Sequence, residues 1–192
     1  MPLVNLAPHR IVKWRRRRWG PGSPKRLLAQ VCFLGACVGW HVCTAQADPE
    51  RLSEHRDWRV YAYYDSGKRY CYAASFPIRR RGDTEGWPDS WLLVSNEPNV
   101  GTRHAISFVL GRPLAPEAIV RANIGTRPFE LYAEGDTAWT ADTSVDLRLV
   151  VAMKRGRRLL ISASAASGER VLDTFSLMGF TQALETLGAQ CR

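Results

Sequence analysis

Acidic residues are missing from the first 47 positions of this 192-residue chain, although that segment contains eight Lys and Arg. Setting these eight apart from the 27 Lys and Arg of the whole chain leaves 19, against 18 Asp and Glu. The formal charge of +9 therefore comes almost entirely from the first segment. A charge excess confined to one end is not the footprint of a nucleic-acid-binding domain, and we expect no nucleic acid partner.

The sequence also lacks an apolar run long enough for a stable transmembrane anchor, which needs about 20 residues. The uncharged, largely apolar stretch at 27–40 is shorter; it follows the basic region and precedes Ala45-Gln46-Ala47. A basic region, an apolar region and an A-x-A site in that order are typical of a secretory signal peptide. We predict a signal peptide over 1–47, with cleavage between Ala47 and Asp48. The mature protein would then be periplasmic, secreted or associated with the outer membrane.

Two alternative export signals lie in the same segment. Leu34-Gly35-Ala36-Cys37 resembles a lipobox, in which Cys37 would be lipidated and would attach the protein to the membrane. Without lipidation, we expect membrane contact to be peripheral. Arg15–Arg18 also resembles part of a twin-arginine signal. The leader is long, so a later translation start than Met1 is a further alternative.

Cysteine is scarce after the leader, where Cys71 and Cys191 remain and no C-x-x-C occurs. Two cysteines in an exported domain most simply pair, because the periplasm is oxidising. A Cys71–Cys191 disulfide would close a loop of about 120 residues and contribute up to ~5 kcal/mol. Two buried free thiols are the alternative. Histidine is equally scarce in this part, at His55 and His104, and we expect neither a metal site nor a cofactor.

Short β-type runs separated by turn signals fill most of the chain after residue 57. Residues 48–57 are polar and are expected to form a loose lead-in, and the region from Pro77 to Pro88 a polar loop. The expected strands are Trp58–Tyr64, Lys68–Phe76, Trp91–Ser95, His104–Gly111, Ala118–Ile124, Phe129–Ala133, Thr137–Ala141, Arg158–Ala165 and Arg170–Phe175.

Two segments are distinguished by their apolar periodicity. The clearest alternation predicts one more strand, with four side chains on one face: Leu147, Leu149, Val151 and Met153. Near the C-terminus the spacing becomes i, i+3, i+4 and i+7, which predicts a short helix over 180–187, with Gly188 just past its end. The predicted fold class is mainly β: an antiparallel β-sandwich or barrel-like domain with a short C-terminal helix.

Several motifs follow one another in a fixed order: Trp58, Cys71, Trp91-Leu92-Leu93-Val94, Ile106 to Gly111, Ala138-Trp139, Leu149-Val150-Val151-Ala152-Met153-Lys154-Arg155-Gly156, Ser162-Ala163-Ser164, Asp173-Thr174-Phe175-Ser176-Leu177-Met178-Gly179-Phe180, Ala183-Leu184 and Cys191. This order resembles the invasion-associated locus B family of exported bacterial proteins. The resemblance implies that 58–192 is one β-rich exported domain, in a family with an association with host-cell invasion in some members. It brings no catalytic residue to this chain, and the long cysteine-rich leader departs from it.

We therefore expect an exported, non-catalytic envelope or surface protein that binds a protein or an envelope component. The alternative is an exported, hydrolase-like enzyme. No G-x-S-x-G motif occurs, and His104 in a strand does not define a catalytic triad, so no catalytic residue is assigned.

Basic side chains of two segments form a candidate surface patch: Arg79, Arg80, Arg81, Arg155, Arg157 and Arg158. Such a patch could bind anionic lipid, lipopolysaccharide or another polyanion. Solvated turn charges that protect sheet edges are the simpler interpretation.

Two further motifs have an ordinary structural explanation. Arg81-Gly82-Asp83 matches the integrin-binding tripeptide, yet an exposed turn has the same composition. Four tryptophans could line a ligand cleft but are expected in the core: Trp58, Trp87, Trp91 and Trp139.

Overall fold

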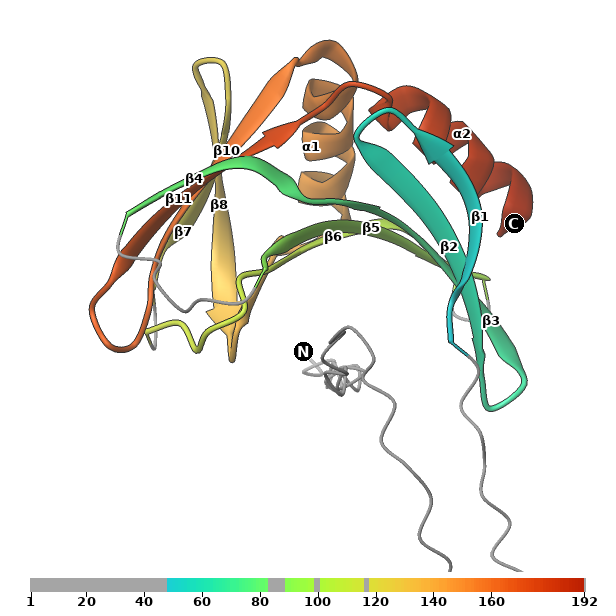
Figure 1. Ribbon diagram of the computed structural model, residues 1–192, viewed down its shortest axis with the longest axis horizontal. Helices are drawn as coiled ribbons and strands as arrows, with labels where there is room; N and C mark the ends of the chain where they lie inside the picture. Colours follow the sequence, from blue (N-terminus) through green and yellow to red (C-terminus); the bar gives the residue numbers. More distant parts are fainter. Residues whose placement is uncertain (1–47, 83–88, 99–100, 116–117, 192) are drawn as a thin grey trace, which may run out of the picture. The chain divides into compact units, whose positions relative to one another are not determined.

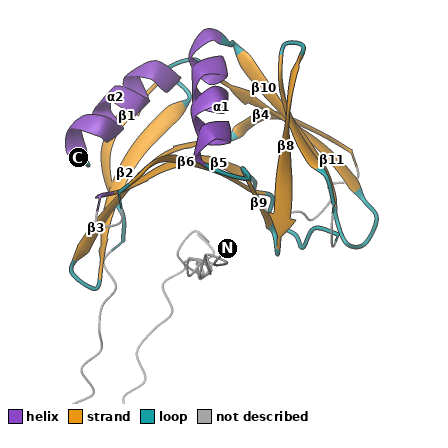
Figure 2. Cartoon of the chain, turned by 180° about the vertical axis from the view of Figure 1, so that it is seen from behind, coloured by secondary structure: helices purple, strands orange, loops and turns teal. Residues whose placement is uncertain are grey.

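The computed structural model describes residues 48–82, 89–98, 101–115 and 118–191. The predicted signal peptide, its alternatives and the Ala47 side of the cleavage site lie outside the described residues. The strands and helices of Figures 1 and 2 are β1 (Glu50–His55), β2 (Trp58–Asp65), β3 (Lys68–Ser75), β4 (Pro77–Gly82), β5 (Trp91–Glu97), β6 (Thr102–Val109), β7 (Val120–Ile124), β8 (Arg127–Glu134), β9 (Thr137–Trp139), α1 (Thr143–Arg155), β10 (Arg158–Ser164), β11 (Arg170–Ser176) and α2 (Phe180–Gln190).

Within the described residues, eleven strands form one antiparallel sheet in the order β1-β2-β3-β5-β6-β9-β8-β7-β10-β11-β4. The predicted mainly β fold with a C-terminal helix is confirmed. We call β1, β2, β3, β5, β6 and β9 the first half of the sheet, and the remaining five strands the second half. Phe76 alone separates β3, which pairs with β5, from β4, which pairs with β11. The chain thus passes at Phe76 from one half to the other, as strands do at the corners of barrel-like sheets.

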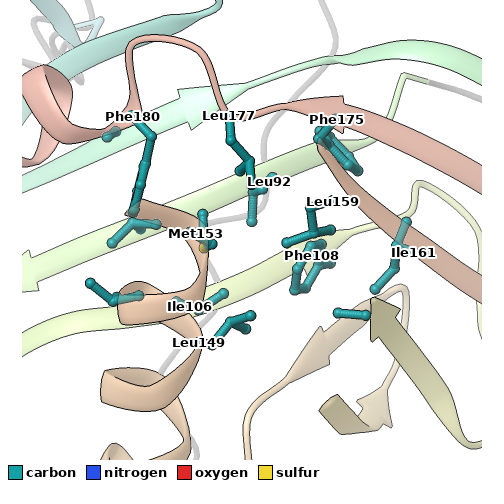
Figure 3. Packing of buried hydrophobic residues seen from close by; sticks show 14 of the residues in the cluster. Leu92, Ile106, Phe108, Leu149, Met153, Leu159, Ile161, Phe175, Leu177 and Phe180 are labelled. Carbon is teal, nitrogen blue, oxygen red and sulfur yellow. The ribbon is translucent and has the colours of Figure 1, made fainter. Parts of the chain in front are cut away.

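The core lies between the two halves and beneath the helices. Buried side chains alternate with exposed ones along the strands, so each strand has an inner and an outer face. The indole Nε1 of Trp58 donates to the Ser176 carbonyl at 3.1 Å, and the rings of Phe108 and Phe175 meet edge to face at 6.2 Å. Figure 3 shows Leu149 of α1 in the same buried cluster as Phe108 and Phe175. Neither helix of the described part is long and apolar enough to cross a bilayer.

The prediction of a strand over 147–153 is wrong, because this segment is part of α1. Asp142 caps the helix by accepting the backbone N–H groups of Ser144 and Val145 at 2.7 and 3.0 Å. The buried apolar side chains are Leu149, Val150, Ala152 and Met153, whereas Leu147 and Val151 are 52% and 45% exposed. The alternating apolar residues therefore do not share a face, and the helical spacing of the buried set was masked by two exposed apolar residues.

The lead-in predicted at 48–57 contains a strand, β1, which pairs with β2. Figures 1 and 2 show α2 lying over this edge of the sheet. One side-chain contact between them joins His55 Nε2 and Thr186 Oγ1 at 3.0 Å. Packing against α2 gives this polar segment a partner that its own composition does not indicate.

The polar loop predicted from Pro77 begins instead as β4, which pairs with β11. The strand is an edge strand rich in arginine, a composition that protects sheet edges from pairing with other chains. Gly188, expected just past the end of the last helix, lies within α2, which ends at Gln190.

A disulfide joins Cys71 in β3 to Cys191 after α2, the pair predicted from the sequence. Both cysteines are buried, and their Cα atoms are 6.0 Å apart. Asn96 Nδ2 in β5 donates to the Cys191 carbonyl at 3.3 Å. The end of the chain is therefore held to two adjacent strands, where a terminal helix would otherwise fray.

Candidate anion-binding face

Arginines converge on the outer face of the second half of the sheet. Cross-strand pairing places Arg81, Leu172, Ser162, Arg121 and Glu130 in one row across five strands. Residues opposite each other in antiparallel strands project to the same side, and adjacent strands are about 4.8 Å apart. The row therefore has arginines near both ends, with small or apolar side chains between them.

A second row lies beside the first. It runs from Arg79 through Thr174 and Leu160 to Asn123 and Pro128. Arg158 and Arg170 lie at opposite ends of β10 and β11 on this part of the molecule. We call five exposed arginines the arginine face: Arg79, Arg81, Arg121, Arg158 and Arg170. Glu130 is the one acidic residue in the two rows. Its Oε1 atom lies 3.7 Å from Arg121 Nε. Both side chains are exposed, so this ion pair is weak.

One hollow opens where α1 ends and β10 begins; we call it the α1 hollow. Its volume is about 690 Å³, and four arginines line it: Arg127, Arg155, Arg157 and Arg158. No acidic residue is among the residues that line it. Gly156 lies at the turn, where a Cβ atom would come within 2.6 Å of Ile124 and 2.9 Å of Leu177. A residue with a side chain at this turn would therefore have to displace core side chains.

A second, smaller hollow lies over the first row of the arginine face. Its volume is about 470 Å³, and it is lined by Arg81, Arg121 and Arg170 together with Ser162 and Ser164. Guanidinium groups present planar pairs of N–H donors that fit the oxygens of phosphate or carboxylate, and serine hydroxyls add neutral donors. The arrangement suits an oxyanion held from two sides.

The structure separates the six arginines of the sequence-predicted patch. Arg79, Arg81 and Arg158 are on the arginine face, and Arg155 and Arg157 line the α1 hollow. Three further arginines were not in the predicted patch: Arg121 and Arg170 of the arginine face, and Arg127 of the α1 hollow. The alternation in Val120–Ile124 marks Arg121 as outward, but nothing local indicates that β7 lies beside β10.

Arg80 does not belong to this surface, because its side chain turns to the inner side of the sheet. Its Nε and Nη2 atoms donate to the two carboxylate oxygens of Asp173 at 2.7 and 2.8 Å. Asp173 is fully buried and also accepts from Ser90 Oγ at 2.5 Å. The hydrogen bonds from Arg80 to Asp173 raise the pKa of the guanidinium, which therefore stays charged. This contact joins β4 to β11 and supports the arginine face from beneath.

His104, the residue considered for catalysis, lies at the start of β6 with a positive φ of 59°. Its backbone N–H donates to Asn96 Oδ1 at 2.9 Å. Burial lowers the pKa of its imidazole, and nearby Lys154 lowers it further, so the ring is neutral at physiological pH. The nearby buried Asp146 accepts from Thr140 Oγ1 at 2.7 Å and from the Ile106 N–H at 2.9 Å.

The remaining sequence motifs are placed in different parts of the molecule. Gly82 ends β4 with a φ of 112°, and Asp83 of the integrin-type tripeptide lies outside the described residues. Trp58 is in the core, as expected. Trp91 and Trp139 are only half-buried, on the outer face of the first half of the sheet, while Trp87 is outside the described residues.

The crystal structure of invasion associated protein B from Bartonella henselae matches this structure with a TM-score of 0.52 and 18% sequence identity. The match covers 75% of this chain and 97% of that protein. The two proteins share a fold. The resemblance to the invasion-associated locus B family is thus confirmed at the level of the fold. No protein-family model and no curated protein matches the chain.

Proposed function

We propose that this protein is exported and acts without catalysis, by binding a phosphate-bearing component of the cell envelope through the arginine face. The observation that carries this proposal is the gathering of five exposed arginines, with a single acidic residue in their two rows. Arginine pairs with phosphate through two parallel hydrogen bonds, which are stronger than those between neutral groups. Envelope lipids and glycolipids present such groups at high surface density.

Export is supported by the disulfide and by the basic and apolar leader. Disulfide bonds persist in oxidising compartments and are rare in the cytosol. The bond between Cys71 and Cys191 connects the front of the domain to its end. These features together support an oxidising, extracytoplasmic site of action.

A non-catalytic role is supported by the way in which hydroxyl groups are used. Ser90 donates to Asp173 at 2.5 Å, and Thr140 donates to Asp146 at 2.7 Å. Both residues are buried in the domain, so neither hydroxyl is exposed to a substrate as a nucleophile must be. Turnover of p-nitrophenyl esters that depends on His55 or His104 would contradict this part of the proposal.

The binding proposal is tested with vesicles of phosphatidylglycerol mixed with phosphatidylcholine. We predict that Arg121→Ser combined with Arg170→Ser weakens co-sedimentation by about tenfold, because two charge-assisted contacts are lost. The same double variant should show a smaller dependence of binding on salt. Binding of the parent to pure phosphatidylcholine vesicles should be weak. Soluble polyphosphate should compete if the phosphate group itself is recognised.

A matched control removes the same charge elsewhere. Arg51→Ser combined with Arg103→Ser changes two exposed arginines of β1 and β6, far from the arginine face in the strand order. This variant should bind as the parent does. Equal losses in both double variants would show that net charge, not the arginine face, governs binding, and would overturn the proposal.

We extend the proposal to host-cell invasion on the name of the structurally similar protein alone. A strain that lacks this protein would enter host cells less efficiently, and the parent gene would restore entry better than the Arg121→Ser and Arg170→Ser variant. Equal entry with and without the protein would separate this chain from invasion while leaving the binding proposal intact.

A further inference from the structure

The α1 hollow and the second hollow adjoin along β10. Arg158 and Leu160 line the first of them, and Ser162 and Ser164 line the second; all four side chains alternate outward on this strand. The lining passes from one hollow to the other between neighbouring outward positions, Leu160 and Ser162. Figure 1 shows the start of β10 between the end of α1 and the tip of the hairpin of β7 and β8, which supplies Arg127 to the α1 hollow. One ligand could therefore lie in both hollows at once.

Arginines gather at both ends of this track. The second hollow is lined by Arg81, Arg121 and Arg170, and the α1 hollow by Arg127, Arg155, Arg157 and Arg158. Among the described residues, no acidic side chain lines either hollow, and none forms an ion pair with the four arginines of the α1 hollow. Like charges gathered around one hollow repel one another, and an anion bound among them relieves this repulsion. Each end of the track is therefore suited to an anionic group.

The surface between the two ends is neutral across three strands. In the second row, Leu160 of β10 lies between Thr174 of β11 and Asn123 of β7. Arg79, at the β4 end of this row, lies one strand further away, beside Thr174. A leucine side chain can pack against the C–H face of a sugar ring, and hydroxyl and amide groups beside it can form hydrogen bonds with sugar hydroxyls. The middle of the track suits an uncharged, hydroxyl-rich spacer.

The length of β10 sets the spacing of the two anionic groups. Arg158 and Ser164 are the two ends of this seven-residue strand, so the far sides of the two hollows are roughly 20 Å apart. Arginine side chains reach inward from both ends on long flexible stems, which brings their donors closer together. A ligand with a single phosphate would leave one of the two arginine clusters without an anion.

We propose that the two hollows hold the two phosphate groups of one ligand, a glycolipid whose disaccharide has a phosphate at each end. This assignment depends on the proposed function, because the second hollow is part of the arginine face. It adds the α1 hollow as a second phosphate site and identifies the envelope component by its chemistry.

The test compares diphosphoryl with monophosphoryl lipid A, each mixed into phosphatidylcholine vesicles to the same surface density of phosphate. In co-sedimentation, the parent should bind the diphosphoryl lipid about tenfold more tightly, because its second phosphate binds within a complex that has already formed. The water-soluble, deacylated bisphosphorylated disaccharide should compete better than inorganic phosphate at equal phosphate concentration. Such competition would distinguish recognition of the headgroup from attraction to a charged membrane.

Arg127→Ser combined with Arg157→Ser removes two charges from the α1 hollow and none from the arginine face. Both side chains are exposed, so the fold should remain intact. Arg155 is left unchanged, because a cation in the last turn of α1 also stabilises the end of the helix. This variant should lose the preference for the diphosphoryl lipid, yet bind the monophosphoryl lipid within about twofold of the parent, since one of two phosphate sites remains.

The matched control is again Arg51→Ser combined with Arg103→Ser, which has the same net charge and should keep the preference. Equal binding of the two lipids by the parent would overturn the two-phosphate assignment and leave the arginine-face proposal in place. The assignment also fails if the variant of the α1 hollow keeps the preference, or if the soluble disaccharide competes no better than inorganic phosphate. A parent that binds neither form of lipid A nor phosphatidylglycerol would overturn the proposed function as well.

Discussion

At the scale of single residues, the two buried acidic side chains among the described residues are satisfied in different ways. Asp173 accepts two hydrogen bonds from the Arg80 guanidinium and another from Ser90, so a cation lies against this buried group. Asp146 has no such cation and accepts instead from two neutral donors, the Thr140 hydroxyl and the Ile106 N–H. Neutral donors compensate less of the cost of burying a charge. The pKa of Asp146 is accordingly raised by burial, and its hydrogen bonds reverse only part of that effect.

The raised pKa of Asp146 predicts that this residue makes the stability of the fold depend on pH. Because its pKa is higher in the folded than in the unfolded state, the folded state is favoured while the group is protonated and loses stability as pH rises. Asp146→Asn removes this titration and keeps an oxygen that can accept both hydrogen bonds. In denaturant titrations from about pH 3 to about pH 7, the variant should therefore gain stability relative to the parent as pH rises. Asp57→Asn, at an exposed turn, is the control. A relative loss for Asp146→Asn over that range would contradict this explanation.

At the scale of elements, the sequence predicts strands better than helices in this chain. Trp58–Asp65 is found nearly as expected, because alternating burial and β-branched or aromatic residues point to the same structure. In 147–153 the same alternation misleads, because Leu147 and Val151 are apolar but exposed on α1. The N-terminal cap at Asp142 and the basic residues of the last turn are the signals of a helix there.

The arginine face could be predicted only in part, because strands distant in sequence bring its residues together. Arg79 and Arg81 are adjacent to Arg80 in sequence, yet alternation in β4 sends Arg80 inward to a buried partner in β11. The pairing of β10 with both β7 and β11 brings Arg121 beside this group. Such non-local pairing has no signature within a short window of sequence.

Glycines at the two ends of α2 give a direct test of its limits. Gly188 lies inside the helix with open space around it, so Gly188→Ala should stabilise the domain by about 0.5–1 kcal/mol. Gly179 has a φ of 93°, and a Cβ there would lie 1.9 Å from the His55 carbonyl oxygen. Gly179→Ala should therefore destabilise strongly in the same thermal unfolding measurement. A loss of stability in Gly188→Ala would instead place the end of the helix before residue 188.

At the scale of the whole molecule, one covalent bond connects the first half of the sheet to the end of the chain. The Cys71–Cys191 bond spans 120 residues, nearly all of the described domain. Cross-linking positions so far apart restricts the unfolded chain more than a short loop does. The two halves also share one core, so loosening α2 exposes side chains around Trp58 and Phe180, whose ring centroids are 4.8 Å apart.

We predict that replacing both cysteines, Cys71→Ser and Cys191→Ser, lowers the free energy of unfolding by about 2–5 kcal/mol. Urea titrations of the parent, with and without a reducing agent, should reproduce the difference between parent and variant. Identical titrations of the oxidised and reduced parent would show that the bond does not stabilise the domain.

The second half of the sheet carries the arginine face, whereas pairs of tyrosines lie on the outer face of the first half. The central proposal is that the arginine face meets the envelope. Hydrogen–deuterium exchange with and without phosphatidylglycerol vesicles tests it most directly, because it locates the contact. The account predicts slower exchange in β7, β10 and the turn after α1, at Val120–Ile124 and 156–164, with little change in the hairpin of β2 and β3. Protection confined to that hairpin, or no protection at any described strand, would contradict the account.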